Sequence, residues 1–395
     1  MADPIAGQTA ICGLGVTEMG KIYGHDSYWF ASEAIKLAVE DAGIDKKDID
    51  GLLINPGITS FLGGGISIPL QNHLGLRNLR LLNHMNSFGA TAIGMVHYAA
   101  MAVNHGMANY VVCVFADAPL QKGGSAGAAY GGGRNRGPEG MASLGPAYGF
   151  YGANTGYALA ARRYMETYGV EQEKLGNVAV AQRQWATTNP HATMRDPITM
   201  EDYDNSRWII EPFHLLDCCL VSNGAVAVIV TTAERAQAAK SDPAYVLGMG
   251  QGHPGNLAHS SVETMTTSGA TLAGETAFNM AAIDRDAIDV CEFYDCYTYT
   301  VLRTLEDYGF CGKGEAGDFV ADGRTAPGGS FPLNTGGGQL SSFYMWGMTP
   351  VAEGVAQARG SAGERQVEKH DAVLISGNGG TLDTHGTLIL SPRQN

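Results

Sequence analysis

"AVEDAGIDKKDIDG" (residues 38–51) and "AFNMAAIDRDAIDV" (residues 277–290) align without a gap at an offset of 239 residues and share six identical residues. Each stretch combines the end of an amphipathic helix, a short polar turn and the start of an apolar strand. The elements around the two stretches follow the same order, which indicates an internal repeat. The repeat therefore predicts a fold of two α/β halves.

The segments around the repeat support this division. A long helix of small residues followed by a strand is predicted over residues 86–118 and again over residues 341–380. Runs such as "YVVCVF" and "AVAVIV" are typical of strands whose sheet is covered on both faces. We expect an N-terminal half over residues 1–240 and a C-terminal half over residues 241–395. Residues 119 to about 215 form an inserted region without a counterpart in the second half.

The inserted region opens with the glycine-rich stretch "KGGSAGAAYGGGRNRGPEG", followed by two helical patterns, "TGYALAARRYMETYG" and "EQEKLGNVAVAQRQWATTN". The glycine stretch matches neither GxGxxG nor GxxxxGK[ST], the two patterns that cradle nucleotide phosphates after a strand. We therefore interpret it as a mobile loop and not as a nucleotide site.

Composition excludes several classes of function. The chain has 395 residues, of which 45% are hydrophobic and 16% charged, as expected for a globular protein with a large core. A formal charge of −14 disfavours binding to nucleic acids or anionic lipid. No apolar run reaches the ~18 residues of a membrane span. The first residues carry an acid, Asp3, where a signal peptide needs basic residues, so we expect a cytoplasmic protein.

Seven cysteines and eleven histidines show no pattern of a disulfide framework or a metal site. The number of cysteines is odd, most of them lie in apolar stretches, and neither CxxC nor HxxxH occurs. We expect buried, inert thiols and no metal. The cysteines are Cys12, Cys113, Cys218, Cys219, Cys291, Cys296 and Cys311.

The stretch "VCEFYDCYTYT" (residues 290–300) raises the question of which side chain does chemistry. Cys291 and Cys296 would be strong nucleophiles as thiolates, but nothing in the segment is arranged to activate either thiol. A tyrosine in an apolar strand ordinarily fills the core. Composition and spacing alone therefore do not single out a catalytic residue here.

Three stretches together resemble the thiolase superfamily, in its sterol-carrier-protein-type branch. They are residues 196–236, "VCEFYDCYTYTVLRTLEDYGFCGKGEAG" (290–317) and "LNTGGGQLSSFYMWGMTPVAE" (333–353), and the resemblance spans nearly the whole chain. It implies a five-layer αβαβα fold made of two repeated halves with an inserted loop domain. This agrees with the repeat, which was found independently of it.

The departures from that family concern its reactive residues. A thiolase carries a nucleophilic cysteine where the long helix of its first half begins, and "HMNSFGATAI" places Asn86 or Ser87 there. Its second cysteine, an acid/base, falls near Ile375. The two histidines of the branch correspond to Tyr294 in "FYDCY" and Tyr344 in "SFYMWG". This set of replacements resembles the lipid-transfer-protein aldolases of bacterial steroid side-chain degradation.

The resemblance implies a lyase that cleaves a β-hydroxyacyl-CoA thioester by a retro-aldol step, for example releasing a 17-keto steroid and propionyl-CoA. It also implies a small OB-fold, zinc-ribbon-type partner, and no cofactor beyond the CoA of the substrate. The missing cysteines suit this chemistry. Thiolytic cleavage needs a nucleophile that becomes acylated, whereas a retro-aldol reaction needs only a base and a proton donor.

We predict that Tyr294 and Tyr344 form the acid/base pair, with Tyr344 preferred as the base because it lies near a predicted helix start. Backbone N–H groups near Ser87 and Gly377 are candidates for binding the thioester oxyanion, and His253 is a candidate for lining the pocket. Four other polar residues of these stretches are expected to be structural: Tyr297, Tyr299, His214 and Asp217.

Two other functions stay open at this point. One is an acyltransferase or thiolase with a displaced nucleophile, for which "LLDCCLVSNG" is the only loop that could offer a thiol. The other is a non-catalytic scaffold that binds acyl-CoA or lipid. We also expect a homodimer, because apolar strands such as "NYVVCVFADA" would be costly as free sheet edges. A small partner is expected because the glycine-rich segment looks too mobile to shape a pocket alone.

Overall fold

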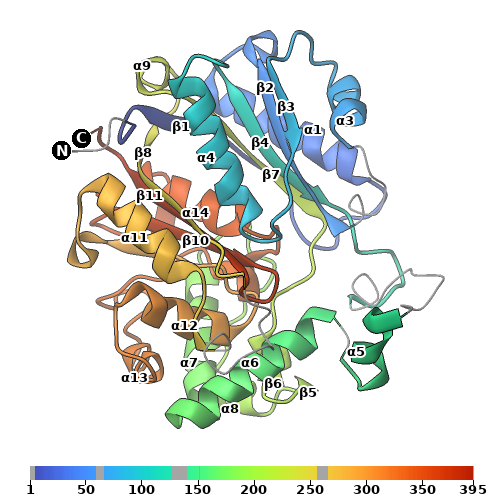
Figure 1. The fold of residues 1–395 in the computed structure, drawn as a ribbon, viewed down its shortest axis with the longest axis vertical. Coiled ribbons are helices and arrows are strands. Elements are labelled where there is room, and N and C mark those ends of the chain that lie inside the picture. Colours follow the sequence, from blue (N-terminus) through green and yellow to red (C-terminus); the bar gives the residue numbers. More distant parts are fainter. Residues whose placement is uncertain (1–4, 59–65, 127–139, 151, 256–265, 395) are drawn as a thin grey trace.

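The computed structural model describes residues 5–58, 66–126, 140–150, 152–255 and 266–394, so most of the glycine-rich stretch lies outside the described residues. A nine-stranded sheet has the order β3-β2-β4-β7-β1-β8-β11-β10-β9 (Figure 1). Its strands are β1 (Thr9–Val16), β2 (Gly51–Pro56), β3 (Leu81–His84), β4 (Val111–Asp117), β7 (Gly224–Thr232), β8 (Ala244–Gly252), β9 (Val290–Glu292), β10 (Val373–Gly379) and β11 (Thr384–Ser391).

The helices divide between the two halves and the inserted region. The halves contain α1 (Ser27–Ala42), α3 (Ser67–Leu74), α4 (Thr91–Asn104), α9 (Ala233–Ala236), α11 (Ala270–Ala281), α12 (Thr298–Tyr308), α13 (Ala316–Phe319) and α14 (Met348–Ala358). The inserted region contains α5 (Leu144–Ala147), α6 (Gly152–Tyr168), α7 (Gln172–Ala186), α8 (Met200–Asp204) and a small sheet of β5 (Trp208–Ile210) and β6 (Phe213–His214).

The repeat seen in the sequence is confirmed as repeated structure. In the first half α1 is followed by a 3₁₀ turn and β2, and in the second half α11 is followed by a 3₁₀ turn and β9. Both helices end at a residue in the left-handed conformation, Gly43 (φ 68°) and Ala282 (φ 54°). Glycine adopts this conformation without steric cost, whereas alanine does so rarely.

The strand order repeats as well. β2 and β4 are parallel, β4 and β7 are antiparallel, and β7 pairs antiparallel with β1. In the second half, β9, β10, β11 and β8 repeat that pattern. The two sets of strands join through a short antiparallel contact between β1 and β8, at Ala10–Tyr245 and Ile11–Ala244. The two expected sheet layers are thus connected into one continuous sheet.

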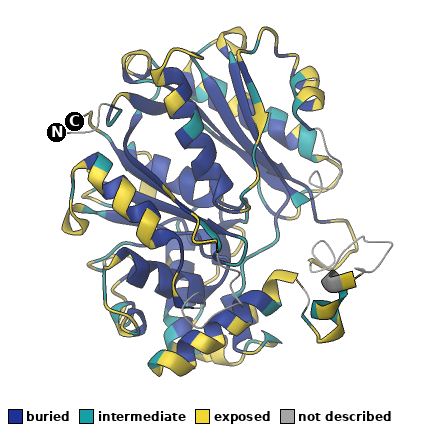
Figure 2. Cartoon of the chain, in the orientation of Figure 1, coloured by how far each residue is buried: buried dark blue, intermediate teal, exposed yellow. Residues whose placement is uncertain are grey.

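Helices cover both sides of these strands. α4 and α14 contact each other and strands of both halves, so they form the middle layer (Figure 1). α1 packs on the outer side of β1 and β7, and α11 packs on the outer side of β8 and β11. The strands and middle helices are almost entirely buried, and exposed residues line the outer faces of α11 and the inserted helices (Figure 2). No helix among the described residues is long and apolar enough to cross a membrane.

The inserted region occupies the connection between β4 and β7. The equivalent connection in the second half, between β10 and β11, is only a short turn at residues 380–383. α6, α7 and α8 lie against the second half, where α7 packs on α12 (Figure 1). The predicted boundary at residue 240 falls in the connection between α9 and β8. The division into folding units stays a prediction.

Two expectations about strands are wrong. β4, the core of "NYVVCVFADA", is not an edge strand but lies between β2 and β7 with all seven residues buried. The first-half end of the sheet is β3, which is short and polar at its last two residues. The apolar strand expected after the second copy of the repeat is short and ends at Glu292, so that Tyr294 lies just beyond it. Sequence periodicity detects strands but carries no information about their order in a sheet.

Candidate active site

The two tyrosines singled out in the sequence lie against each other. The hydroxyl oxygens of Tyr294 and Tyr344 are 3.0 Å apart, although the residues are separated by 50 positions. Their ring centroids are 6.5 Å apart with an interplanar angle of 65°. Tyr294 is buried and follows the end of β9, whereas Tyr344 is half-buried and precedes α14. The structure therefore joins them into a tyrosine pair, in which one phenol donates a hydrogen bond to the other.

Two turns of the same conformation lead into α4 and α14. We call residues 87–91 the first elbow and residues 345–349 the second elbow. Each contains an aromatic residue in the left-handed region, Phe88 at φ 50° and Trp346 at φ 48°. A non-glycine residue rarely adopts this conformation, and such strain clusters at functional sites. The signal in the sequence is aromatic-Gly-x-Thr, in "FGAT" and "WGMT", a second repeat that was not among the predicted ones.

Equivalent hydrogen bonds close the two elbows. The Ser87 N–H donates to Thr91 Oγ1 at 2.6 Å, and the Met345 N–H donates to Thr349 Oγ1 at 2.9 Å. The Ser87 N–H that we suggested as a donor to substrate is therefore already bonded to Thr91. Ser87 stays a candidate only through its position in the first elbow.

Three glycines allow the elbows to meet the tyrosine pair. A Cβ atom at Gly89 would lie 2.2 Å from both Tyr294 Cε2 and the Asn378 carbonyl oxygen. A Cβ at Gly347 would lie 2.2 Å from the Gly89 carbonyl oxygen, and one at Gly377 would lie 2.6 Å from the same oxygen. Real Cβ atoms do not approach other atoms so closely, so only glycine fits at these positions. Gly377, a predicted site residue, thus lies directly behind the first elbow.

Asp295 connects the two tyrosine-bearing segments. Its carboxylate accepts the Gln339 N–H at 2.9 Å and the Leu340 N–H at 3.2 Å. These donors belong to a single π-helical turn (Gly338–Ser342) that leads to Tyr344. Burial raises the pKa of Asp295 to about 7, and the backbone hydrogen bonds only partly offset that rise. No sequence pattern indicated this role, because the partners lie more than 40 residues away.

The cysteines show no activated thiol. All seven are free, and burial raises every one of their pKa values. The pKa is about 12 for Cys218, one of the two thiols in "LLDCCLVSNG", and is raised well above the ordinary value for its neighbour Cys219. A hydrogen bond from Tyr344 offsets part of the rise at Cys219. These thiols therefore stay protonated near neutral pH and are poor nucleophiles.

His253, the remaining predicted pocket residue, lies at the end of β8. Its ring nitrogens contact Gln251 Oε1 at 3.2 Å and Thr384 Oγ1 at 2.8 Å. Thr384 pairs with Gly379 across β11 and β10, so one strand separates His253 from the strand of Gly377. Its hydrogen bonds in the described structure are to strand residues and not to the tyrosine pair.

The polar residues expected to be structural have buried partners. The Tyr297 hydroxyl donates to Asn154, and the Tyr299 hydroxyl accepts from Arg303 at 2.8 Å. The Asp217 carboxylate accepts the His214 N–H at 2.7 Å, together with side-chain hydrogen bonds from Tyr203 and Thr298. These contacts fix the junction between the inserted region and α12.

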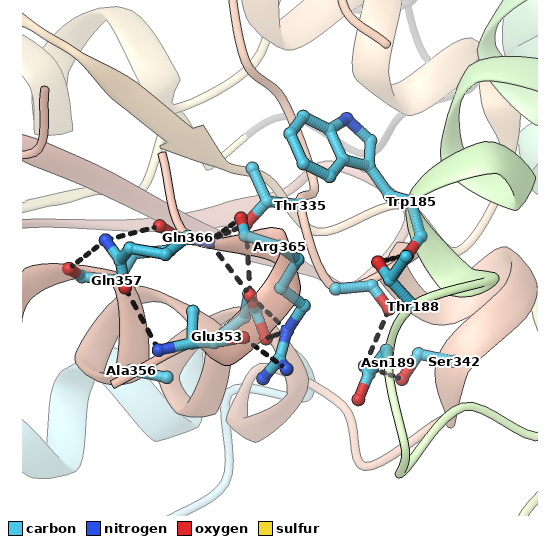
Figure 3. A network of polar contacts seen from close by, with 12 residues as sticks. Trp185, Thr188, Asn189, Thr335, Ser342, Glu353, Ala356, Gln357, Arg365 and Gln366 are labelled. Atoms are coloured by element: carbon cyan, nitrogen blue, oxygen red, sulfur yellow. Dashed lines mark hydrogen bonds and ion pairs between the residues drawn. The ribbon is translucent and has the colours of Figure 1, made fainter. Parts of the chain in front are cut away.

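A cavity of about 150 Å³ lies behind the tyrosine-bearing segments. Phe293 and Phe343, the chain neighbours of the tyrosine pair, line it, whereas the two tyrosines are not among its lining residues. Figure 3 shows its polar side, where Glu353 on α14 forms an ion pair with Arg365 at 2.8 Å. We interpret this network as support for the segments that carry the tyrosines. Among the described residues, no cluster of His, Cys, Asp and Glu is placed to bind a metal ion.

Comparisons with known proteins agree with this architecture. Residues 250–392 match the family model "Thiolase C-terminal domain-like". The steroid side-chain-cleaving aldolase of Thermomonospora curvata is 36% identical over 98% of this chain and 99% of that protein. The 17-hydroxy-3-oxo-4-pregnene-20-carboxyl-CoA lyase of Mycobacterium tuberculosis is 36% identical over 98% of this chain and 100% of that protein.

A solved structure, described as the Ltp2-ChsH2(DUF35) aldolase, matches with a TM-score of 0.84 and 35% identity. The match covers 98% of this chain and 99% of the solved chain. The alignments with these relatives cover nearly the full length of each chain. They therefore include both halves, both elbows and the inserted region. The chain therefore belongs to the thiolase superfamily, in the family that includes this aldolase and this CoA lyase.

Proposed function

We propose that this chain is a carbon–carbon lyase that cleaves a β-hydroxyacyl-CoA thioester with a steroid side chain by a retro-aldol step. The observation that carries the proposal is the hydrogen bond of 3.0 Å between the Tyr294 and Tyr344 hydroxyls, in a site without an activated thiol. The aldolase and lyase relatives supply the class of substrate. A 17-keto steroid and propionyl-CoA are the example of products that we expect.

The tyrosine pair accounts for both proton transfers of the reaction. The phenolate of Tyr344 takes the proton of the β-hydroxyl, and the Cα–Cβ bond then breaks to release the ketone. The electron pair of that bond becomes the thioester enolate, which Tyr294 protonates at Cα. The hydrogen bond between the phenols then returns a proton from Tyr344 to Tyr294, which restores the starting state. No step attaches the substrate to the protein.

The position of Tyr344 favours its role as the base. It stands immediately before the second elbow, close to the N-terminus of α14, a helix of 11 residues. The positive end of a helix dipole stabilises a nearby anion, and the hydroxyl of Tyr294 can donate to the phenolate. Ordinary tyrosines have a pKa of ~10, so a base that works near neutral pH requires such stabilisation.

Ser87, Gly377 and His253 stay proposed binding residues for the thioester and the substrate. Gly377 lies directly behind the first elbow, because a Cβ atom there would lie 2.6 Å from the Gly89 carbonyl oxygen. Backbone N–H groups that point to developing negative charge stabilise enolates effectively. The proposal needs no cofactor beyond the CoA that the substrate carries.

The acyltransferase alternative is disfavoured by the thiols. It requires a thiolate in "LLDCCLVSNG", and burial raises the pKa of Cys218 to about 12. The scaffold alternative predicts that neither tyrosine affects any reaction, so the experiments below separate it from the lyase.

For partners, we propose a cytoplasmic homodimer that works with a small OB-fold, zinc-ribbon-type protein. The end strand β3 gives a physical reason for the dimer, because the outer edge of a strand is a template for pairing with a second chain. The solved relative is named together with a second component, ChsH2(DUF35), which supports the small partner. Sedimentation should give twice the mass of the chain, and a monodisperse monomer at micromolar concentration would contradict the dimer.

The function is tested with a panel of β-hydroxyacyl-CoA steroids, with and without the small partner, and mass spectrometry of the products. Tyr294→Phe and Tyr344→Phe should each lower kcat by ~10² or more, because each removes a proton carrier. The dissociation constant of the thioester should change little. Tyr98→Phe, on α4, is the matched control and should retain kcat. Near-normal turnover in either site variant would refute the assignment.

A further inference from the structure

The backbone of Tyr294 is held beyond the end of its strand. The ladder between β9 and β10 ends at Glu292–Ile375, two residues before Tyr294. Past this point Asn378 Nδ2 donates to the Tyr294 carbonyl oxygen at 3.3 Å, and Thr300 Oγ1 donates to the same oxygen at 3.1 Å. Asn378 thus continues the connection to β10 with its side chain where the ladder has ended.

The other end of the Asn378 amide contacts the inserted region. Tyr157, on α6, donates its hydroxyl to Asn378 Oδ1 at 3.0 Å, and both side chains are buried. The Tyr294 carbonyl can only accept, so Nδ2 must face it and Oδ1 must face Tyr157. Tyr157 is therefore the donor. Burial raises the pKa of Tyr157 well above its ordinary value, so its hydroxyl keeps the proton that it donates.

Close packing fixes Tyr157 in this position. A Cβ atom at Gly156 would lie 2.9 Å from Thr381 Cγ2, so α6 is pressed against the turn that follows β10. The ring of Tyr157 contacts the ring of Tyr297 with centroids 4.8 Å apart. The inserted region thus reaches the end of β10 through α6, which has no counterpart in the second half.

The backbone of Asn378 and the ring of Tyr294 also meet at Gly89. Both the Asn378 carbonyl oxygen and Tyr294 Cε2 lie 2.2 Å from the place that a Cβ of Gly89 would occupy. A shift of Asn378 therefore moves the first elbow and Tyr294 together. Because these groups are close-packed, small displacements are transmitted and not absorbed.

We propose that Tyr157 and Asn378 form a positioning pair that sets the phenol of Tyr294 for proton transfer. The inserted region thereby takes part in the reaction without touching the reacting atoms. This inference rests on the proposed function, because it assigns the pair an effect only through Tyr294. A displacement of about 1 Å in a catalytic group can lower a rate by about 10²-fold.

The test compares Tyr157→Phe with Tyr164→Phe, using the chain together with its small partner if one is needed for activity. Both variants lose a buried phenol hydroxyl on α6, but the Tyr164 hydroxyl donates to Glu306, away from Asn378. Tyr157→Phe should lower kcat by roughly 10-fold with KM unchanged, and Asn378→Ala should lower kcat by at least as much. Tyr164→Phe should reduce thermal stability and leave kcat unchanged.

The decisive measurement repeats these variants in the Tyr294→Phe background under single-turnover conditions. A pair that acts through Tyr294 has no further effect there, whereas independent effects multiply. If Tyr157→Phe behaves like Tyr164→Phe, or still lowers kcat 10-fold in the Tyr294→Phe background, the positioning pair is refuted. Failure of the proposed function is distinguishable, because Tyr294→Phe alone would then retain turnover. If Asn378→Ala does not fold, Tyr157→Phe carries the test by itself.

Discussion

The two elbows have the same backbone but contribute different things to the site. The second elbow is preceded by Tyr344, whereas Asn86 holds the equivalent place before the first elbow. The first elbow contributes space instead, since Gly89 leaves room for the ring of Tyr294. The geometry of the elbow is therefore repeated in both halves, whereas the tyrosine pair lies in the second half alone.

The strands β2 and β9, which precede the elbows in the two halves, differ in length. β2 continues to Pro56, so that Asn55, the counterpart of Tyr294, stays paired within the sheet opposite Phe115. β9 ends at Glu292, which frees the following residues to turn toward the first elbow. A shorter strand in one half thus allows Tyr294 to reach the first elbow and Tyr344.

The largest expected difference between the elbows concerns their aromatic residues. Trp346 is 7% exposed and stacks on Phe115 with centroids 5.2 Å apart, whereas Phe88 is 49% exposed. Trp346→Ala should lower the free energy of unfolding by about 3–5 kcal/mol, because it leaves a cavity in the core. Phe88→Ala should cost about 1 kcal/mol or less. Urea unfolding measures both, and equal losses would show that the elbows are energetically equivalent.

The second prediction tests the space that the first elbow provides. Gly89→Ala should lower kcat by about 10²-fold, because its Cβ would occupy the position of the Tyr294 ring and displace the phenol. Gly94→Ala is the control in α4, the helix that follows the first elbow, where the nearest atom to an added Cβ is 3.6 Å away. This control should keep its turnover and gain about 0.5–1 kcal/mol of stability. Full activity of Gly89→Ala would disprove the close fit.

The third prediction uses Asp295, whose counterpart in the first half is Pro56 and cannot titrate. The pKa of Asp295 is raised from 3.8 to about 7 in the folded state, which therefore binds more protons than the unfolded state between these values. The contribution of Asp295 to the free energy of unfolding is fully present below pH ~4. It declines as the pH rises toward 7, by at most about 1.4 kcal/mol per pH unit.

Unfolding free energies of Asp295→Asn and of the unchanged chain should therefore diverge in slope between pH 4.5 and 7. The variant should show the shallower decline, since its amide does not titrate. Parallel curves for Asp295→Asn and the unchanged chain would contradict the raised pKa.

The smallest effect is expected from the thiols of the second half. Cys291→Ala and Cys296→Ala should each cost about 1–2 kcal/mol of stability, because both side chains are buried, and should leave kcat unchanged. Thiol reagents should likewise leave turnover of the folded enzyme intact. Mass spectrometry that trapped a CoA-derived acyl group on any cysteine would revive the acyltransferase alternative.

Local signals in the sequence were enough to predict the duplication and the residues available for chemistry. The repeat at residues 38–51 and 277–290 consists of two local patterns, the period of an amphipathic helix and the apolar run of a strand. These patterns can be recognised without knowing which residues contact each other in the fold. The replacement of reactive cysteines and histidines is likewise a matter of residue identity. Tyr294 and Tyr344 could therefore be named in advance as a pair, although their contact could not.

Which of these residues come into contact depends on the tertiary structure. It placed β4 inside the sheet and ended β9 two residues before Tyr294. It also brought Tyr157 to Asn378 across 221 positions of the chain. Strand order and close packing set these contacts, and they depend on the whole chain at once. The periodicity of local segments contains no information about these contacts, which is why Asp295 and Asn378 showed no signal in the sequence.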